Sequence, residues 1–160
     1  MIECLQTTSI DHISVKQLCS TADINRSTFY FYYQDLQELY SELEEEFLKK
    51  VDKAMFDYYN KSINLHIHLL NLVKCYDENS EMFLSMVNSR NKAFYNAQKA
   101  FIEKYHFIDD KTPEERDYFI QYYISGITGV ITHWILTGKK QSPEYIASFL
   151  ANNGRIVEPS

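Results

Sequence analysis

Residues 14–40, SVKQLCSTADINRSTFYFYYQDLQELY, predict two short helices joined by a tight turn and followed by a longer helix. Ser14 and Gln17 have the spacing of a capping box at the start of the first helix, where free backbone donors need partners. An apolar or small face then recurs at helical spacing. Its members are Val15, Leu18, Cys19 and Ala22.

The predicted turn is Asp23-Ile24-Asn25. Aspartate tolerates the left-handed backbone that a tight connection between helices requires. Ile24 is expected to fill the space between the helices, and Asn25 to cap the second one. Phe29 lies four residues after this cap and is expected to face the first helix. The layout is that of a helix-turn-helix, whose second helix can enter a DNA major groove.

This segment resembles the DNA-binding segment of TetR-type transcriptional regulators, with the pattern T-V-x-x-I-A-x-x-A-G-V-S-x-x-T-x-Y-x-x-F. The matching positions are Ser14, Val15, Leu18, Cys19, Ala22, Ile24, Asn25, Thr28, Tyr30 and Tyr33. Residues 123–150, YISGITGVITHWILTGKKQSPEYIASFL, are similar to the C-terminal region of a branch that contains dihydroxyacetone-kinase regulators. Together the two resemblances cover about a third of the chain, toward its two ends.

The resemblance implies an all-α protein with a helix-turn-helix head over residues 1–40, a sensing and dimerisation body over 41–153, and a tail over 154–160. Residues 1–10 are similar to only the latter half of the family's first helix, so this head is expected to be truncated or to begin upstream. The resemblance also implies a homodimer through residues 118–138 and 143–152. Its partners would be a palindromic DNA operator and a small-molecule or protein effector.

In this reading the first turn of the second helix supplies base contacts. The candidates are Arg26, Ser27 and Thr28, with Phe31 able to meet a thymine methyl group. Ser14, Tyr30 and Tyr32 are candidates for phosphate contacts, which position a protein without specifying sequence. Two alternatives stay open: Arg26 can pair with Asp23, and Tyr32 can pack beneath the following helix.

The rest of the chain predicts a helical body. Apolar stripes favour helices over residues 35–59, 62–76, 80–88 and 90–105. Thr112-Pro113-Glu114-Glu115 is typical of a helix start, and Gly138 of a helix end. Between them, residues 118–138 carry no charged side chain. Gln121, Thr132 and His133 interrupt this run, which favours a buried or self-associating helix over a membrane span.

Thirteen tyrosines, ten phenylalanines and one tryptophan are available to line an effector pocket or simply to fill the core. The predicted lining residues are Tyr76, Phe83, Met86, Tyr95, Tyr122, Tyr123 and Trp134. Aromatic interiors are also typical of ordinary cores, so both interpretations stay open.

Charge argues against a strong general affinity for DNA. The chain carries a net charge of −6, and residues 1–40 contain two basic and five acidic residues. Phosphate neutralisation supplies most non-specific DNA affinity. The family usually has a lysine near the start of the helix after the recognition helix, where this chain has Gln34 and Asp35. The alternative function is therefore a TetR-shaped sensor that acts through a protein partner.

Other function classes find little support. The sequence has no glycine-rich phosphate loop and no G-x-S-x-G, so no enzyme activity is expected. His66 and His68 are two residues apart and would diverge on a helix, so neither a metal site nor a cofactor is expected. Three unpatterned cysteines and the lack of a secretory signal suggest a cytoplasmic protein.

Overall fold

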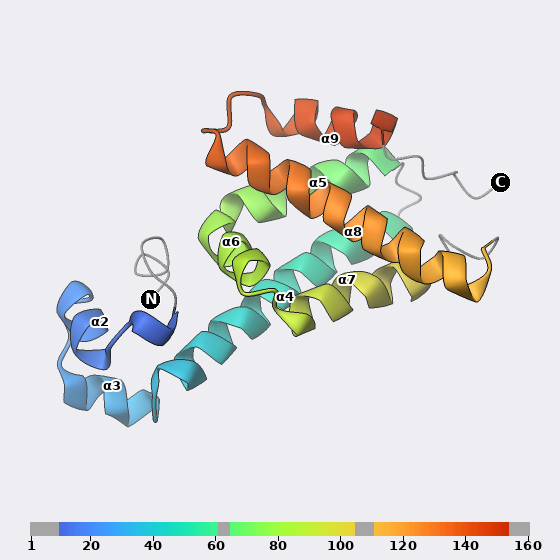
Figure 1. The fold of residues 1–160 in the computed structure, drawn as a ribbon. Coiled ribbons are helices and arrows are strands. Elements are labelled where there is room, and N and C mark those ends of the chain that lie inside the picture. Colours follow the sequence, from blue (N-terminus) through green and yellow to red (C-terminus); the bar gives the residue numbers. More distant parts are fainter. Residues whose placement is uncertain (1–9, 61–64, 105–110, 154–160) are drawn as a thin grey trace.

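The computed structural model describes residues 10–60, 65–104 and 111–153 of the 160-residue chain. These residues form eight α-helices and one 3-10 helix and contain no strand, which confirms the all-α prediction (Figure 1). The elements are η1 (Ile10–His12), α2 (Val15–Thr21), α3 (Arg26–Tyr32), α4 (Leu36–Asn60), α5 (Leu65–Glu78), α6 (Ser80–Asn88), α7 (Lys92–Lys104), α8 (Pro113–Leu136) and α9 (Pro143–Asn153).

The head contains α2, α3 and a small hydrophobic core of its own. Its buried members are Ile13, Leu18, Cys19 and Phe29. The Ser14 hydroxyl accepts a hydrogen bond from the Gln17 backbone N–H at 3.2 Å, and the Asn25 side chain accepts one from Ser27 at the same distance. Asp23 has a φ of 52°, the left-handed conformation predicted for the turn. These local features hold α2 and α3 in the helix-turn-helix arrangement.

One detail of the predicted turn is wrong. Ile24 was expected to fill the space between the two helices, but it is 42% exposed. Its backbone N–H donates to the Cys19 carbonyl at 3.0 Å, which closes the end of α2 without needing the side chain inside. The head core is completed instead by Leu36 and Leu39 of α4.

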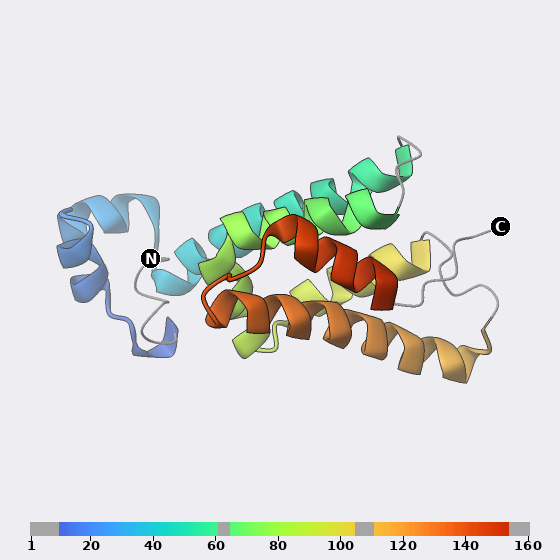
Figure 2. The same cartoon turned by 90° about the horizontal axis from the view of Figure 1, so that it is seen from above.

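Helix α4 connects the head to the body, and Figures 1 and 2 show the head at its N-terminal end and the body packed along the rest of the helix. Its start is fixed by Asp35, whose carboxylate accepts from the Glu38 N–H at 2.9 Å. Glu38 in turn accepts from the Gln34 N–H at 2.6 Å. Acidic side chains at a helix N-terminus satisfy free donors and favour the helix dipole.

The body core is built largely from aromatic and aliphatic side chains of α4 to α9. Tyr76 stacks on Phe83 with ring centroids 4.4 Å apart, and Phe47 and Phe94 meet the same cluster. Helix α5 packs against both α4 and α9. The aromatic residues of α5 and α6 therefore serve first to join the body helices.

Helix α8 begins and ends as the sequence predicts. Thr112 and Glu115 form a complete capping box, and Pro113 occupies the first turn. After Leu136 the chain turns through Gly138 at a φ of 89°, a conformation that glycine adopts without strain. The predicted span of 118–138 is thus the larger part of a helix that starts at Pro113.

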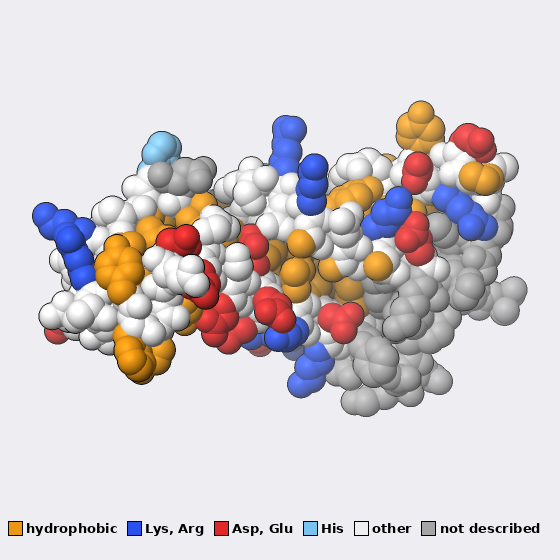
Figure 3. All heavy atoms as spheres, turned by 90° about the horizontal axis from the view of Figure 1, so that it is seen from below, with side chains coloured by type: hydrophobic (Ala, Val, Ile, Leu, Met, Phe, Trp, Pro, Cys, Tyr) orange, Lys and Arg blue, Asp and Glu red, His pale blue; other side chains and the backbone are white. Residues whose placement is uncertain are grey.

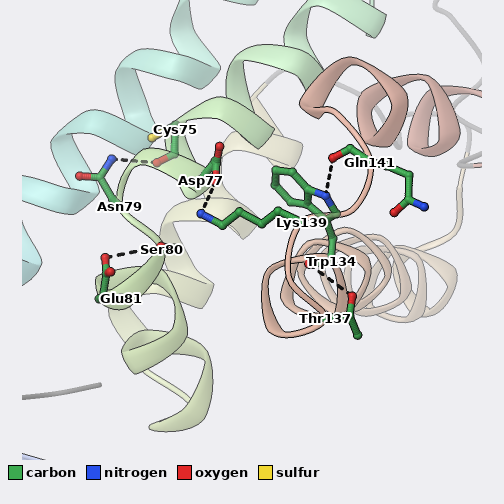
Figure 4. A network of polar contacts seen from close by, with 9 residues as sticks. All are labelled: Cys75, Asp77, Asn79, Ser80, Glu81, Trp134, Thr137, Lys139 and Gln141. Atoms are coloured by element: carbon green, nitrogen blue, oxygen red, sulfur yellow. Dashed lines mark hydrogen bonds and ion pairs between the residues drawn. The ribbon is translucent and has the colours of Figure 1, made fainter. Parts of the chain in front are cut away.

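An ion pair attaches the turn between α8 and α9 to α5, and a hydrogen bond ties the turn back to α8 (Figure 4). Lys139, at a φ of 51°, forms an ion pair of 2.5 Å with Asp77. The Trp134 indole N–H donates to the Gln141 carbonyl at 2.9 Å. These contacts fix where α9 begins relative to α8.

The remaining boundaries differ from the predicted ones by a few residues. The predicted helices 35–59 and 90–105 correspond to α4 and α7, and 80–88 coincides with α6. The predicted start at residue 62, the tail 154–160 and most of the truncated first helix lie outside the described residues. Among the residues described, no helix has the length and apolarity needed to cross a bilayer.

Two polar side chains, His68 and Gln98, are almost fully buried in the body. Both line a cavity of about 20 Å³ together with Met55, Leu72 and Tyr123. Burial lowers the pKa of His68 from 6.5 to about 4, because the low-dielectric interior disfavours the charged imidazolium. The folded protein therefore keeps His68 neutral at pH values where an unfolded chain would protonate it.

We expect the body to lose stability on acidification through this one group. The contribution of His68 is complete above pH 6.5 and is lost as the pH falls toward 4, because the unfolded state binds the proton first. At pH 4.5 the loss amounts to roughly 2–3 kcal/mol. Urea unfolding at pH 7 and at pH 4.5 measures this difference in the free energy of unfolding.

The His68→Gln variant lacks the titrating group and should lose correspondingly less stability between the two pH values. His66→Gln, on the same helix but only partly buried, is the matched control and should behave as the parent protein does. An equal pH dependence in His68→Gln and the parent would contradict the assignment.

Candidate functional site

The most exposed aromatic surface of the head lies on α3. Tyr30, Phe31 and Tyr32 are 57%, 80% and 68% exposed. The Phe31 and Tyr32 rings contact each other edge to face with centroids 5.0 Å apart. Phe29 points the other way, into the head core, where it contacts Tyr33. Helix α3 therefore packs against the head core through Phe29 and exposes the next three aromatic side chains to solvent.

The predicted base-contacting residues lie in the first turn of this helix. Arg26, Ser27 and Thr28 are all exposed, and so is Ser14 at the start of α2. Among the described ion pairs none joins Arg26 to Asp23. Tyr32 is exposed and does not pack beneath α4. Both structural alternatives for these side chains are thus wrong, whereas the contacts with DNA stay predictions.

The surroundings of the head are acidic. Figure 3 shows acidic side chains gathered between the head and the body, over the first part of α4, and hydrophobic side chains exposed beside them. A hydrogen bond to Glu42 is the largest cause that raises the pKa of Tyr33, followed by burial and the charges of Glu42, Glu46 and Glu38. Tyr33 thus attaches the end of α3 to the acidic side of α4.

Two polar contacts connect α4 to the body close to the head. The Tyr40 hydroxyl lies 2.8 Å from the Ser85 hydroxyl of α6. One turn further on, Glu44 accepts a hydrogen bond of 2.6 Å from the Asn91 amide, in the turn between α6 and α7. Burial raises the pKa of both Tyr40 and Glu44. Both contacts are partly shielded from water, which strengthens each hydrogen bond between α4 and the α6–α7 region.

A depression with a volume of about 500 Å³ lies in the body between α6, α7 and α8. We call it the α6–α8 groove. Its walls are formed by side chains from all three helices and from the turn that contains Arg90 and Asn91. A second, more apolar groove of about 200 Å³ lies between α8 and α9 and includes Tyr122, Gly126 and Phe149.

The predicted ligand-binding residues are divided among three environments. Met86 and Tyr95 line the α6–α8 groove, and Tyr122 and Tyr123 line the groove between α8 and α9. Tyr76, Phe83 and Trp134 are buried in the body core. Their role in ligand binding remains a prediction.

Sequence reasoning missed the polar residues of the α6–α8 groove. Arg90, Lys92 and Gln98 line it but belong to no recognisable motif. The one local signal was the Ser-Arg-Asn run at residues 89–91, which marks the turn between two helices. Among the described residues, no group of three or more His, Cys, Asp or Glu side chains is placed to hold a metal ion.

One face of the body is apolar and uncovered within the described chain. It follows a stripe along α8 and continues on α9, and we call it the α8–α9 face. Its members are Tyr118, Tyr122, Gly126, Gly129, Leu136, Tyr145 and Phe149, all exposed. A Cβ atom added at Gly126 or Gly129 would meet nothing within 4 Å. Packing within the described chain therefore does not require either glycine.

Comparisons with known proteins agree with this architecture. Residues 63–153 match the TetR-type family model described as "Transcriptional regulator C-terminal region". The chain is 23% identical over 156 residues to the "Uncharacterized HTH-type transcriptional regulator YxbF" of Bacillus subtilis (strain 168). That match covers 92% of this chain but 40% of YxbF, so the chain spans well under half the length of this relative.

A solved structure shares the fold. The "Dihydroxyacetone kinase operon activator DhaS" superposes with a TM-score of 0.58 at 24% sequence identity, covering 94% of this chain and 87% of that one. The family match alone spans more than half of the 160 residues, including the whole of α5 to α9. The chain therefore belongs to the TetR family of transcriptional regulators, a family without enzymatic activity.

Proposed function

We propose that this chain acts as a cytoplasmic dimer that binds a palindromic DNA operator through α3 and responds to an effector bound in the body. The observation that carries the proposal is the exposure of Tyr30, Phe31 and Tyr32 beside Arg26, on the side of α3 that faces away from the head core. A recognition helix that enters a major groove packs against its own domain on one side and exposes the other side to DNA.

Arg26, Ser27 and Thr28 would contact base edges, and Phe31 a thymine methyl group. Ser14, Tyr30 and Tyr32 would contact phosphates and fix the register of the helix. Two such heads related by a two-fold axis would contact half-sites about 34 Å apart. The dimer also doubles the few basic residues available, since each head offers only Lys16 and Arg26 over residues 1–40.

The α8–α9 face supports a dimer. Glycine in the middle of a helix costs about 1 kcal/mol relative to alanine, so an exposed helix has no reason of its own to carry Gly126 and Gly129. Small residues permit close approach of two helix backbones. Tyr122 and Phe149 border these glycines and would supply apolar area to the interface.

A second function is favoured by the charge of the head. Five acidic residues against two basic ones over residues 1–40 oppose phosphate binding, and Phe31 is as accessible to a protein as to DNA. In this alternative the chain is a TetR-shaped sensor that acts through a protein partner. DhaS is an operon activator by name, and a similar role for this chain rests on analogy alone.

We expect the protein to retard duplex DNA from the region upstream of its gene, with a salt dependence set by few cations. The two heads offer at most four basic side chains to the phosphates, so the slope of log K against log salt concentration should be no steeper than about −4. Arg26→Ala should weaken binding at least about tenfold, because one base contact is worth about 1–3 kcal/mol and the dimer loses two. Fluorescence anisotropy measures both quantities.

Lys49→Ala is the matched control, because Lys49 is exposed on α4 and pairs only with Glu45 among the described residues. It removes the same charge and should leave DNA affinity nearly unchanged. Absence of retardation even at low salt, in the parent protein and in Arg26→Ala alike, would favour the sensor that does not bind DNA.

We also expect Gly129→Leu to weaken self-association at least about tenfold. The new side chain has free space in the single subunit but would separate two helices that meet at this point. Sedimentation equilibrium gives the dissociation constant, and circular dichroism verifies that the helices are retained.

Ala100→Leu, at an exposed position of α7, adds the same bulk outside the α8–α9 face and serves as the control. If Gly129→Leu raises thermal stability by virtue of its higher helix propensity and leaves the subunit mass distribution unchanged, this face is not the dimer interface.

A further inference from the structure

We propose that the α6–α8 groove binds a small organic anion with an apolar, preferably aromatic, body. That this anion is the effector rests on the proposed function, whereas its binding to the groove does not. The groove has about 500 Å³, within the range of sites for small-molecule ligands. Its chemistry is uneven, with cations at one edge, an apolar floor and uncharged polar groups on the opposite wall.

The cationic edge is the turn between α6 and α7. Arg90 and Lys92 both line the groove on either side of Asn91, and both are exposed. Neither forms an ion pair with another described residue, whereas Lys49, Lys74, Lys99 and Lys139 are all paired with carboxylates. Two neighbouring cations without a counter-charge in the described chain are suited to an anion.

None of the described residues that line the groove is acidic. Glu44 is not among the lining residues; it accepts a hydrogen bond from the amide of Asn91, which does line the groove, and burial raises the pKa of Glu44. The nearby Asp117 and Glu103 are held by Lys99. A cationic ligand would therefore meet repulsion at the turn without compensation along the walls.

The floor of the groove is apolar. Met86 and Phe94 are fully or almost fully buried at its base, and Ile124 closes it from α8. An aromatic ring laid on this floor would lie over Phe94, a favourable partner for π surfaces, and against the Ile124 side chain. The apolar body would supply most of the affinity, and the anionic group would set the orientation.

The wall opposite the cations is polar and uncharged. Gln121 donates to the Ser125 hydroxyl at 2.8 Å, and the Thr128 hydroxyl donates to the Ile124 carbonyl at 2.7 Å. The Ser125 hydroxyl accepts in the first contact, so its own proton remains for a ligand. Gln98, 5% exposed, lies at the deep end and separates the groove from the cavity beside His68. A second polar substituent on the ligand would fit here.

The test uses 2-naphthoate as the anionic probe and 2-naphthamide as its neutral isostere, titrated into the intact protein without DNA. Methyl NMR signals of Met86 and Ile124 report binding in the groove. We expect saturable shifts of these signals with naphthoate and at least tenfold weaker binding of naphthamide, because only the anion gains charge-assisted hydrogen bonds.

Arg90→Gln and Lys92→Gln should each weaken naphthoate binding severalfold and leave naphthamide binding unchanged. Lys140→Gln removes the same charge at an exposed position outside the groove and should have no effect. Equal affinity for the two probes would overturn the proposal, as would parental naphthoate affinity in the double variant Arg90→Gln/Lys92→Gln. Shifts confined to the methyl signals of Val130 and Leu150 would overturn it as well, since they would move the ligand to the groove between α8 and α9.

The two proposals fail separately. Binding of naphthoate in the groove by a protein that retards no DNA would sustain the site and reject the operator-binding function. Retardation of DNA by a protein that shows no preference for the anion would sustain the operator-binding function and reject the anion site. If both hold, naphthoate should change the DNA affinity of the parent protein and affect that of Arg90→Gln/Lys92→Gln much less.

Discussion

Helix α4 takes part in two hydrophobic cores, and the rest of the molecule depends on this constraint. Leu36 and Leu39 close the small core of the head, whereas Tyr40, Phe47 and Val51 lie in the core of the body. The change from one core to the other occurs within a single helical turn. Because an α-helix is stiff over such a distance, the direction of α4 in the body sets the position of α3 outside it.

The contacts of α4 with the body are chemically different along its length. Close to the head they are polar, through Tyr40 to Ser85 and Glu44 to Asn91. Farther along they are the close-packed side chains of Phe47 and Val51. Packed cores resist small displacements, whereas a few hydrogen bonds exchange partners at modest cost.

Local signals in the sequence predicted much of this fold. Ser14, Asn25 and Thr112 cap helices as their positions indicate, and Asp23 and Gly138 take the left-handed conformations that their turns require. Each of these depends on a few neighbouring residues, so no tertiary information was needed. Ile24 shows the limit, because its exposure depends on Leu36 and Leu39, more than ten residues away, completing the head core instead.

The candidate sites also differ in whether neighbouring residues or tertiary packing determine them. The exposed residues of α3 follow from helical periodicity once Phe29 is assigned to the core. The α6–α8 groove joins Arg90 of the α6–α7 turn to Ser125 of α8, and no periodicity within a single helix predicts that meeting. Aromatic content was equally uninformative, because Tyr76 and Phe83 stack in the core whereas Tyr95 lines the groove. Likewise His66 and His68 are alike in sequence, and only packing decides that His68 is buried.

The acidic head is less of an obstacle to DNA binding than its net charge suggests, because its charges differ in position. Asp35 and Glu38 cap the N-terminus of α4, where backbone donors and the helix dipole offset part of their field. Arg26 and Lys16 remain exposed and unpaired with any described carboxylate. Screening at physiological salt acts over about 8 Å, so a phosphate at α3 is affected mainly by its immediate neighbours. A protein of this kind would gain little from general attraction to DNA and would depend on the fit of α3 to a particular sequence.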